Sequence, residues 1–169
     1  MDKRFRGKIA VVTGAGGRNI GRALAVGFAR EGARTVLVGR TESSLADVAA
    51  EIEALGGECM VAQADVSVEA DVLRVFSEIS KQFGAVDILL NNAAQNLKCD
   101  TVHTDVQDWD RVIEVNLRGP FLCSREALKI MIPRGHGRII NIASMAGKEA
   151  LATRGAYSAS KFALLGLTE

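Results

Sequence analysis

The stretch Lys8–Gly21 reads KIAVVTGAGGRNIG, and it joins a short apolar run to a glycine-rich turn. Lys8–Thr13 has the apolar, β-branched composition of a buried strand, and an amphipathic helix is predicted from about Ile20 to Glu31. A strand that turns through glycines into a helix lets a pyrophosphate approach the backbone closely, where free N–H groups and the helix dipole can bind it. The stretch therefore indicates the first unit of a dinucleotide-binding domain rather than a plain tight turn.

The alternation of strand and helix continues along the chain. Further strands are predicted at Arg34–Gly39, Cys59–Ala64, Val86–Asn91 and Arg138–Ala143, and helices at about Val106–Met131 and Thr153–Thr168. Two more helices are predicted from their apolar faces, one capped by Thr41 with Leu45, Val48, Ile52 and Leu55, and one opened by Ser67 with Val72, Val75, Phe76, Ile79 and Phe83. The strands are nearly all apolar, as expected of parallel strands covered on both faces. The sequence thus predicts one NAD(P)-binding α/β domain over residues 1–169, with a Rossmann-type doubly wound parallel sheet.

The composition is that of a soluble globular protein. The chain is 48% hydrophobic and 24% charged, and its net charge of +1 implies no general attraction to nucleic acid or to an anionic membrane. No apolar run approaches the roughly 20 residues that span a bilayer, and the basic N-terminus lacks the apolar stretch of a signal peptide. Three widely spaced cysteines and two isolated histidines indicate neither a disulfide framework nor a metal site. We therefore expect a cytoplasmic protein that binds no metal.

The end of the second predicted strand bears on the choice of cofactor. Many NAD-binding domains carry an acidic residue near this point, which accepts hydrogen bonds from the adenosine ribose. The strand here ends in Gly39-Arg40, with Glu42 close by. Arg40, together with Arg18 in the glycine-rich turn, can instead neutralise a 2′-phosphate. The sequence favours NADP as the cofactor, with NAD possible.

Ser144 and the run Tyr157-Ser-Ala-Ser-Lys161 complete a recognisable set. With them the chain resembles the short-chain dehydrogenase/reductase family, most closely its 3-oxoacyl-carrier-protein-reductase-like branch. The matching elements occur in order along the whole chain: the glycine-rich turn, Asp65-Val66, Asn91-Asn92-Ala93-Ala94, Asn116, Ser144, Tyr157 and Lys161. A Tyr-x-x-x-Lys pair alone occurs by chance on many helices, but the ordered set does not.

The resemblance implies hydride transfer between NADP(H), or NAD(H), and a carbonyl or secondary alcohol. A proton must then move at the carbonyl oxygen, and a free tyrosine, with a pKa of about 10, is a poor base near neutral pH. A lysine four residues later on the same helical face favours the phenolate. The resemblance implies that Tyr157 is the general acid/base, that Lys161 assists it and binds the nicotinamide ribose, and that Ser144 donates a hydrogen bond to the substrate oxygen.

Asn116 is the fourth catalytic residue that the resemblance implies. Pro120 lies four residues later in the predicted helix, has no N–H to give the carbonyl at i−4, and pushes that carbonyl aside. The main-chain carbonyl of Asn116 is therefore expected to be free to hold a water. In this family such a water links the lysine to solvent, and we expect Pro120 to support the relay by kinking the helix.

The resemblance also implies a set of cofactor contacts. They are Thr13, Gly14, Gly16, Arg18, Asn19, Ile20 and Gly21 in the first turn, then Arg40, Asp65, Val66, Asn92, Ala93, Tyr157 and Lys161. Asp65 and the Val66 N–H would meet the adenine. The turn is one residue longer than the family's, and Asn19 stands where its middle glycine is expected. Asparagine tolerates left-handed backbone conformations, so the turn can still form.

The chain ends at Glu169, shortly after Lys161, whereas family members commonly run to about 250 residues. We therefore expect a fragment whose fold is incomplete at the C-terminus, without the substrate-closing segment and with Leu164, Leu165 and Leu167 partly uncovered. A full-length form is expected to be a homodimer or homotetramer. An enzyme is the favoured interpretation, and a non-catalytic dinucleotide-binding fragment is the alternative. A flavodoxin-like domain shares the sheet but does not explain the catalytic set.

Overall fold

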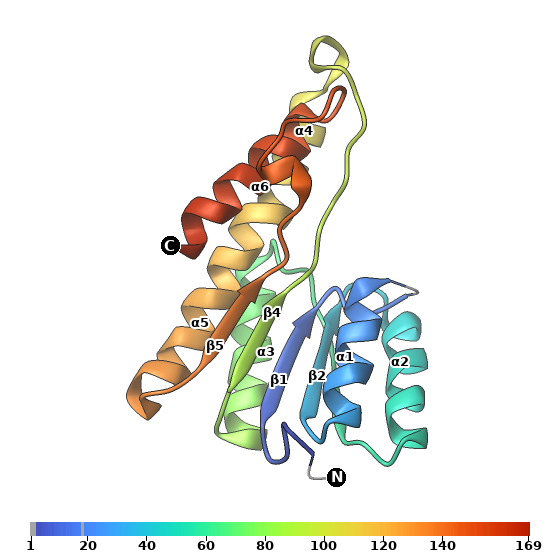
Figure 1. Ribbon diagram of the computed structural model, residues 1–169, viewed down its shortest axis with the longest axis vertical. Coiled ribbons are helices and arrows are strands. Elements are labelled where there is room, and N and C mark those ends of the chain that lie inside the picture. Colours follow the sequence, from blue (N-terminus) through green and yellow to red (C-terminus); the bar gives the residue numbers. More distant parts are fainter. Residues whose placement is uncertain (1–2, 18) are drawn as a thin grey trace.

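The structure is a computed structural model that describes residues 3–17 and 19–169. Its strands are β1 (Ile9–Thr13), β2 (Arg34–Gly39), β3 (Cys59–Gln63), β4 (Ile88–Asn91) and β5 (Arg138–Asn141). Its α-helices are α1 (Ile20–Arg30), α2 (Glu42–Ala54), α3 (Glu69–Phe83), α4 (Val106–Ile113), α5 (Gly119–Arg134) and α6 (Gly155–Thr168), shown in Figure 1. Shorter helical segments are η1 (Thr101–His103), η2 (Glu114–Arg118) and η3 (Met145–Gly147).

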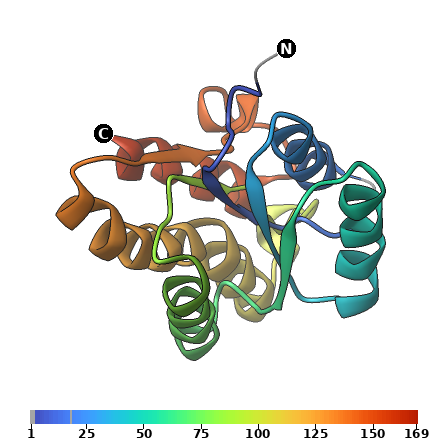
Figure 2. The same cartoon turned by 90° about the horizontal axis from the view of Figure 1, so that it is seen from below.

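The strands form one parallel sheet in the order β3-β2-β1-β4-β5. In the register, Val11 of β1 lies between Val36 of β2 and Leu89 of β4. Helices α1 and α2 cover one face of the sheet, and α3 and α5 cover the other, as Figure 2 shows from below. Helix α6 packs against η2, η3 and α4. The predicted doubly wound α/β sheet is therefore confirmed.

Each face of the sheet has its own hydrophobic core. Ile9 and Val11 of β1 point into the core with α3 and α5, whereas Ala10 and Val12 point into the core with α1 and α2. This alternation follows from the two-residue period of a strand, and because both faces are covered, neither set is polar. Burying a valine or leucine side chain in this way contributes roughly 1.5–3 kcal/mol.

Three details of the helices differ from the sequence prediction. Leu55 is not part of the apolar face of α2, because the helix ends at Ala54 and Leu55 is 43% exposed. Ser67 does not cap α3: Val68 occupies that position, and the Ser67 hydroxyl bonds Asp65 instead. Leu164 is fully buried rather than uncovered, although Leu167 remains exposed.

The long helix predicted over residues 106–131 is three segments in the structure. Helix α4 ends at Ile113, a π-helical turn spans Glu114–Arg118, and α5 begins at Gly119. Asn116 lies inside the π-helical turn, and Pro120 follows in the first turn of α5. The expected irregularity at Asn116 is present as this wider turn. Proline fits there because its missing N–H removes the donor that a regular α-helix needs for the carbonyl of residue 116.

A buried carboxylate joins three segments at the amino ends of the strands. Asp87, 6% exposed, accepts hydrogen bonds from the Ile9 N–H (2.9 Å) and from Lys8 Nζ (3.3 Å). Its Oδ1 also lies 3.1 Å from His136 Nε2, in the turn before β5. Burial by itself raises the pKa of Asp87, but the hydrogen bonds from Ile9 and Lys8 outweigh it and lower the pKa below its usual value.

Replacement of this carboxylate, Asp87→Asn, is expected to lower the free energy of unfolding by about 1–3 kcal/mol near pH 7. The native pKa of Asp87 lies below that of the unfolded chain, which is about 3.9. The stabilisation is therefore complete above that pH and is lost as the pH falls through the native pKa. Urea unfolding near pH 7 and near pH 3 should show that the difference in free energy of unfolding between wild type and variant is smaller in acid. Asp47→Asn, on the exposed face of α2, is the control; an equal gap at both pH values would contradict the electrostatic explanation.

No helix in residues 3–17 or 19–169 is long and apolar enough to cross a membrane.

Candidate functional site

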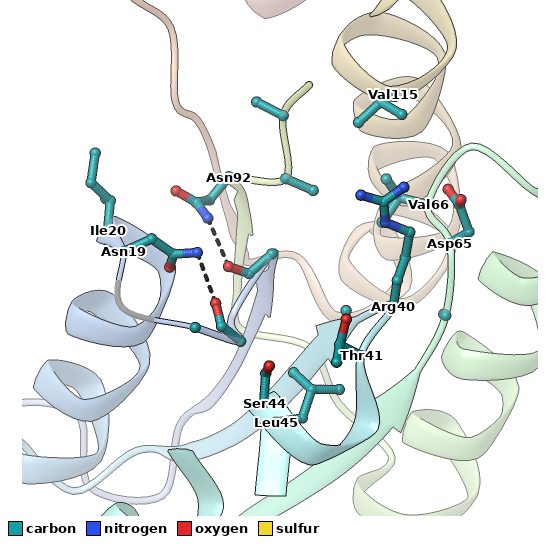
Figure 3. Close-up of a pocket in the computed structure, with 17 residues that line it drawn as sticks. Asn19, Ile20, Arg40, Thr41, Ser44, Leu45, Asp65, Val66, Asn92 and Val115 are labelled. Carbon is teal, nitrogen blue, oxygen red and sulfur yellow. Dashed lines mark hydrogen bonds between the residues drawn. The ribbon is translucent and has the colours of Figure 1, made fainter. Parts of the chain in front are cut away.

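A pocket of about 410 Å³ lies at the carboxyl ends of the strands, beside β1, where the strand order changes direction: the chain runs from β1 outward to β2 and β3 and then crosses back to β4 on the other side of β1. Ligands of open α/β sheets bind at such a point. Nine of the predicted cofactor residues line it: Gly14, Gly16, Asn19, Ile20, Arg40, Asp65, Val66, Asn92 and Ala93. Arg18 lies outside the described residues. Figure 3 shows the side chains that converge on the pocket.

The glycine-rich turn forms in a way that the sequence did not predict. Asn19 is extended (φ −141°) rather than left-handed, and it caps α1: its Oδ1 accepts from the Arg22 N–H, 3.2 Å away. Its Nδ2 donates to the Gly16 carbonyl oxygen at 2.7 Å (Figure 3). The left-handed positions fall on Gly14 (φ +65°) and Gly17 (φ +78°) instead. Asn19 thus closes a longer turn through its side chain: the turn forms as expected, but without the left-handed backbone that asparagine tolerates.

Gly21 and Thr13 do not line the pocket, but their contacts position the loops that do. A Cβ on Gly21 would collide with the Gly14 carbonyl oxygen and lie 2.6 Å from Asn92 Nδ2, so α1 can approach the turn only at glycine. Buried Thr13 Oγ1 accepts from the N–H groups of Asn92 (3.0 Å) and Ala93 (3.1 Å). Asn92 Nδ2 in turn donates to the Thr13 and Gly14 carbonyl oxygens. These bonds hold the loops after β1 and β4 together.

Arg40, Thr41 and Ser44 form the wall of the pocket next to β2. Figure 3 shows the exposed Arg40 side chain extending over the pocket from the end of β2, where Gln63 Nε2 holds the Arg40 carbonyl oxygen at 2.9 Å. Thr41 occupies the predicted N-cap position of α2, but its hydroxyl makes no capping bond. The Arg40 guanidinium and the hydroxyls of Thr41 and Ser44 thus lie together at the N-terminus of α2, a position that favours an anion. Sequence reasoning missed Ser44, although its i+3 spacing from Thr41 was a usable signal.

Asp65 lines the pocket after β3, and its carboxylate is held on both oxygens. Oδ1 accepts from the Ser67 N–H (3.0 Å) and hydroxyl (2.7 Å), and Oδ2 accepts from Arg111 Nη2 of α4 (2.6 Å). Burial by itself raises the pKa of Asp65, but the hydrogen bonds from Arg111 and Ser67 outweigh it and hold the pKa below its usual value. The sequence pointed to Asp65 but not to its two partners.

Lys161 and Tyr157 lie together on α6. Lys161 is 3% exposed, and its Nζ lies 5.7 Å from the centroid of the Tyr157 ring. The same Nζ donates to the Ile142 carbonyl oxygen at 2.7 Å, and burial lowers the pKa of Lys161. The loop after β5 packs directly on α6, because a Cβ on Gly147 would stand only 2.8 Å from the Lys161 carbonyl oxygen. Neither Tyr157 nor Lys161 lines the 410 Å³ pocket.

Ser144 lies in that same loop, immediately before η3. Its Oγ accepts a hydrogen bond from the Ala146 N–H, 3.2 Å away. This bond uses a lone pair of Oγ and does not involve the hydroxyl proton of Ser144.

The side chain of Asn116 is fully engaged inside the protein. Its Oδ1 accepts from the Gln95 N–H (2.7 Å), and its Nδ2 donates to the Gln95 carbonyl oxygen (2.9 Å) and to Ser160 Oγ (3.0 Å). Ser160 Oγ in turn donates to the Tyr157 carbonyl oxygen at 2.7 Å. Asn116 thereby ties the loop after β4 to α6. The side chain is therefore engaged within the protein, and the role of the Asn116 main-chain carbonyl stays a prediction.

The residues present fit a dinucleotide phosphate. The backbone of the glycine-rich turn and the N-termini of α1 and α2 supply donors for its phosphates, with the Arg40 cation beside them. Tyr157, Lys161 and Ser144 carry a phenol, an ammonium and a hydroxyl, which are groups of the kinds that can move a proton or stabilise a developing oxyanion.

Comparisons with known proteins agree with this arrangement. Residues 8–169 match the family described as short chain dehydrogenase. The chain is 42% identical to a 3beta-hydroxysteroid dehydrogenase of Mediterraneibacter gnavus, over 98% of this chain and 60% of that protein. It is 37% identical to a 3-oxoacyl-[acyl-carrier-protein] reductase of Synechocystis sp., over 96% of this chain and 66% of that protein. The chain thus spans less than two thirds of the length of these relatives.

Two solved structures have the same fold. One is a metagenomic short-chain oxidoreductase in complex with NADP, with a TM-score of 0.93 and 38% identity over 96% of this chain and 74% of that chain. The other is an NAD+-bound xylitol dehydrogenase, with a TM-score of 0.94 and 35% identity over 98% of this chain and 64% of that chain.

Proposed function

Because the chain belongs to the short-chain dehydrogenase family, we propose that it acts as an NADP(H)-dependent oxidoreductase on a carbonyl or secondary alcohol. The observation that carries the proposal is the pairing of buried Lys161 with Tyr157 on α6, in a chain whose glycine-rich turn lines a pocket at the carboxyl ends of the strands. When bound, the cofactor supplies or accepts the hydride. The protein itself binds and orients both partners and moves the proton.

Three side chains divide the proton chemistry. Tyr157 donates a proton to the carbonyl oxygen in reduction and accepts it back in oxidation. Lys161, fixed by the Ile142 carbonyl, favours the phenolate of Tyr157 through its positive charge. Ser144, whose hydroxyl proton is not involved in the bond from Ala146, donates a hydrogen bond to the substrate oxygen as negative charge develops there. The Asn116 carbonyl holds the water that connects Lys161 to solvent.

The wall formed by Arg40, Thr41 and Ser44 supports NADP over NAD. A guanidinium, two hydroxyls and a helix N-terminus suit a 2′-phosphate, and Glu42, the acidic residue in the first turn of α2, is not among the residues that line the pocket. An NADP complex and an NAD+ complex both occur among the similar structures. The remaining cofactor contacts, including Asp65 and Val66 at the adenine, follow from the family.

Arg40→Ser is expected to weaken NADPH binding about 10- to 100-fold, because a charge-assisted bond to the 2′-phosphate is lost. The affinity for NADH should change by no more than about twofold, since NADH has no phosphate at that position. Fluorescence titration with NADPH and with NADH measures the dissociation constants of both cofactors for wild type and variant. Arg34→Ser, at the other end of β2, is the control. Equal losses for NADPH and NADH would mean that Arg40 does not read the 2′-phosphate.

The function itself is tested by NADPH titration followed by carbonyl-dependent NADPH oxidation with 3-oxoacyl thioesters, ketones and sugars. Turnover of any of them supports the oxidoreductase. Binding of NADPH without turnover of any carbonyl would overturn the enzyme proposal and favour the non-catalytic dinucleotide-binding protein. Assembly as a homodimer or homotetramer and a cytoplasmic location remain predictions from the family.

A further inference from the structure

Arg111 does not line the pocket, but it holds the carboxylate of Asp65, which does. Among the described lining residues, Asp65 is the only acid. Arg111, which reaches it from α4 across 46 positions of sequence, uses both ends of its guanidinium: Nη2 bonds Asp65 Oδ2 at 2.6 Å, and Nη1 bonds Ser67 Oγ at 2.8 Å. Because Ser67 Oγ itself donates to Asp65 Oδ1, the three side chains form a closed ring of hydrogen bonds.

The ring leaves the carboxylate with a defined remaining capacity. Asp65 Oδ1 already accepts two hydrogen bonds from Ser67, whereas Oδ2 accepts one from Arg111. A carboxylate oxygen can accept two, so Oδ2 keeps one acceptor site. An ionised carboxylate cannot donate. The Asp65 side chain can therefore accept a bond from an amino group and rejects a carbonyl oxygen placed at the same point.

The guanidinium of Arg111 is held mainly by the hydrogen bonds of this ring. Glu114 Oε2 is 3.8 Å from Arg111 Nη1, a weaker contact on its own helix. The Asp65 backbone is held separately, because its N–H donates to Asp71 Oδ2 at 2.9 Å. The loop thus has its own backbone anchor, and Arg111 acts on the side chain of Asp65.

We propose that Arg111 is a positioning residue for base recognition, which fixes the Asp65 carboxylate in the pocket wall so that the site selects a base with an amino donor. The inference rests on the proposed binding of NADP(H), whose adenine carries such an amino group. The hypoxanthine analogue of NADPH carries a carbonyl oxygen in its place. Arg111 therefore sets the preference for adenine over hypoxanthine without touching the cofactor.

The test compares the dissociation constants of NADPH and its hypoxanthine analogue for wild type, Arg111→Met and Arg111→Lys. Wild type should prefer NADPH by about tenfold, the value of one bond to a charged group, and Arg111→Met should reduce the preference to about twofold. Arg111→Lys should restore part of it, because a cation returns without the two-ended guanidinium. Arg125→Met is a matched control: the Arg125–Glu69 bond is also 2.6 Å, Arg125 is 34% exposed against 33% for Arg111, and the pair joins α5 to α3.

The outcomes separate this inference from the function on which it rests. If wild type binds neither nucleotide, the proposed cofactor is wrong and this inference falls with it. If wild type prefers NADPH and Arg111→Met keeps the same preference, or weakens both nucleotides equally, Arg111 is a structural residue only. An NMR titration of the Asp65 carboxyl group gives an independent readout: its pKa should rise in Arg111→Met and stay unchanged in Arg125→Met.

Discussion

Replacement of Tyr157 by phenylalanine is expected to lower the rate of carbonyl-dependent NADPH oxidation by about 10²–10⁴-fold, the usual contribution of a general acid. The substitution removes one hydroxyl and keeps the ring near Lys161, so NADPH affinity should stay within about twofold of wild type. Steady-state kinetics with a carbonyl that wild type reduces, together with fluorescence titration of NADPH, measures the two effects separately. The chain has one tyrosine, so no second phenol can substitute for it.

Ser158→Ala is the control for this experiment. It also deletes a hydroxyl from α6, but that hydroxyl accepts from the Leu151 N–H at 3.3 Å and has no part in the proposed proton transfer. Its turnover should remain close to that of wild type. A Tyr157→Phe variant that keeps more than about a tenth of the activity would remove Tyr157 from the role of general acid.

Gly21→Ala should weaken NADPH binding by at least about 100-fold and destabilise the fold by about 1–3 kcal/mol, the usual cost of overpacking. The added Cβ would collide with the Gly14 carbonyl oxygen and press on Asn92 Nδ2, which stands 2.6 Å from its position. Helix α1 would have to move away from the turn that forms the pocket. Cofactor titration and urea unfolding measure the two losses.

The same helix supplies a matched control in Gly27→Ala. A Cβ at Gly27 meets nothing within 4 Å, so this variant should gain roughly 0.5–1 kcal/mol of stability from the better helix propensity of alanine. NADPH binding should be unchanged. If both alanine variants bind NADPH like wild type, the contact between α1 and the turn is not what forms the cofactor site.

The fold was predictable because it depends on local periodicity. The strand runs are apolar on both faces, and the helices between them carry one apolar stripe, so the doubly wound sheet follows from the order of the elements. The glycine-rich turn and the Tyr157–Lys161 spacing likewise rest on neighbouring residues. Where a stripe reached the end of its helix, as at Leu55, periodicity no longer indicated burial.

The rest depends on hydrogen bonds that periodicity does not encode. At the sequence level Asn19 was considered only for the backbone conformations that asparagine tolerates. In the structure its side chain forms hydrogen bonds with residues on both sides of it in the turn. The pairing of Arg111 with Asp65 joins elements 46 residues apart. The helical pattern of residues 106–131 does not indicate the π-helical turn at Asn116. Pro120 was the one residue in the sequence that suggested an irregularity there.

The Asp87 carboxylate and the cofactor pocket lie at opposite edges of one sheet. The bonds that fix the relative position of β1, β4 and the segment before β5 are therefore remote from the loops that carry chemistry. Free-energy changes at such distant sites are close to additive. Natural or directed evolution can thus reshape the loops at the carboxyl ends for a new ligand, while compensating changes around Asp87 restore stability independently of those loops.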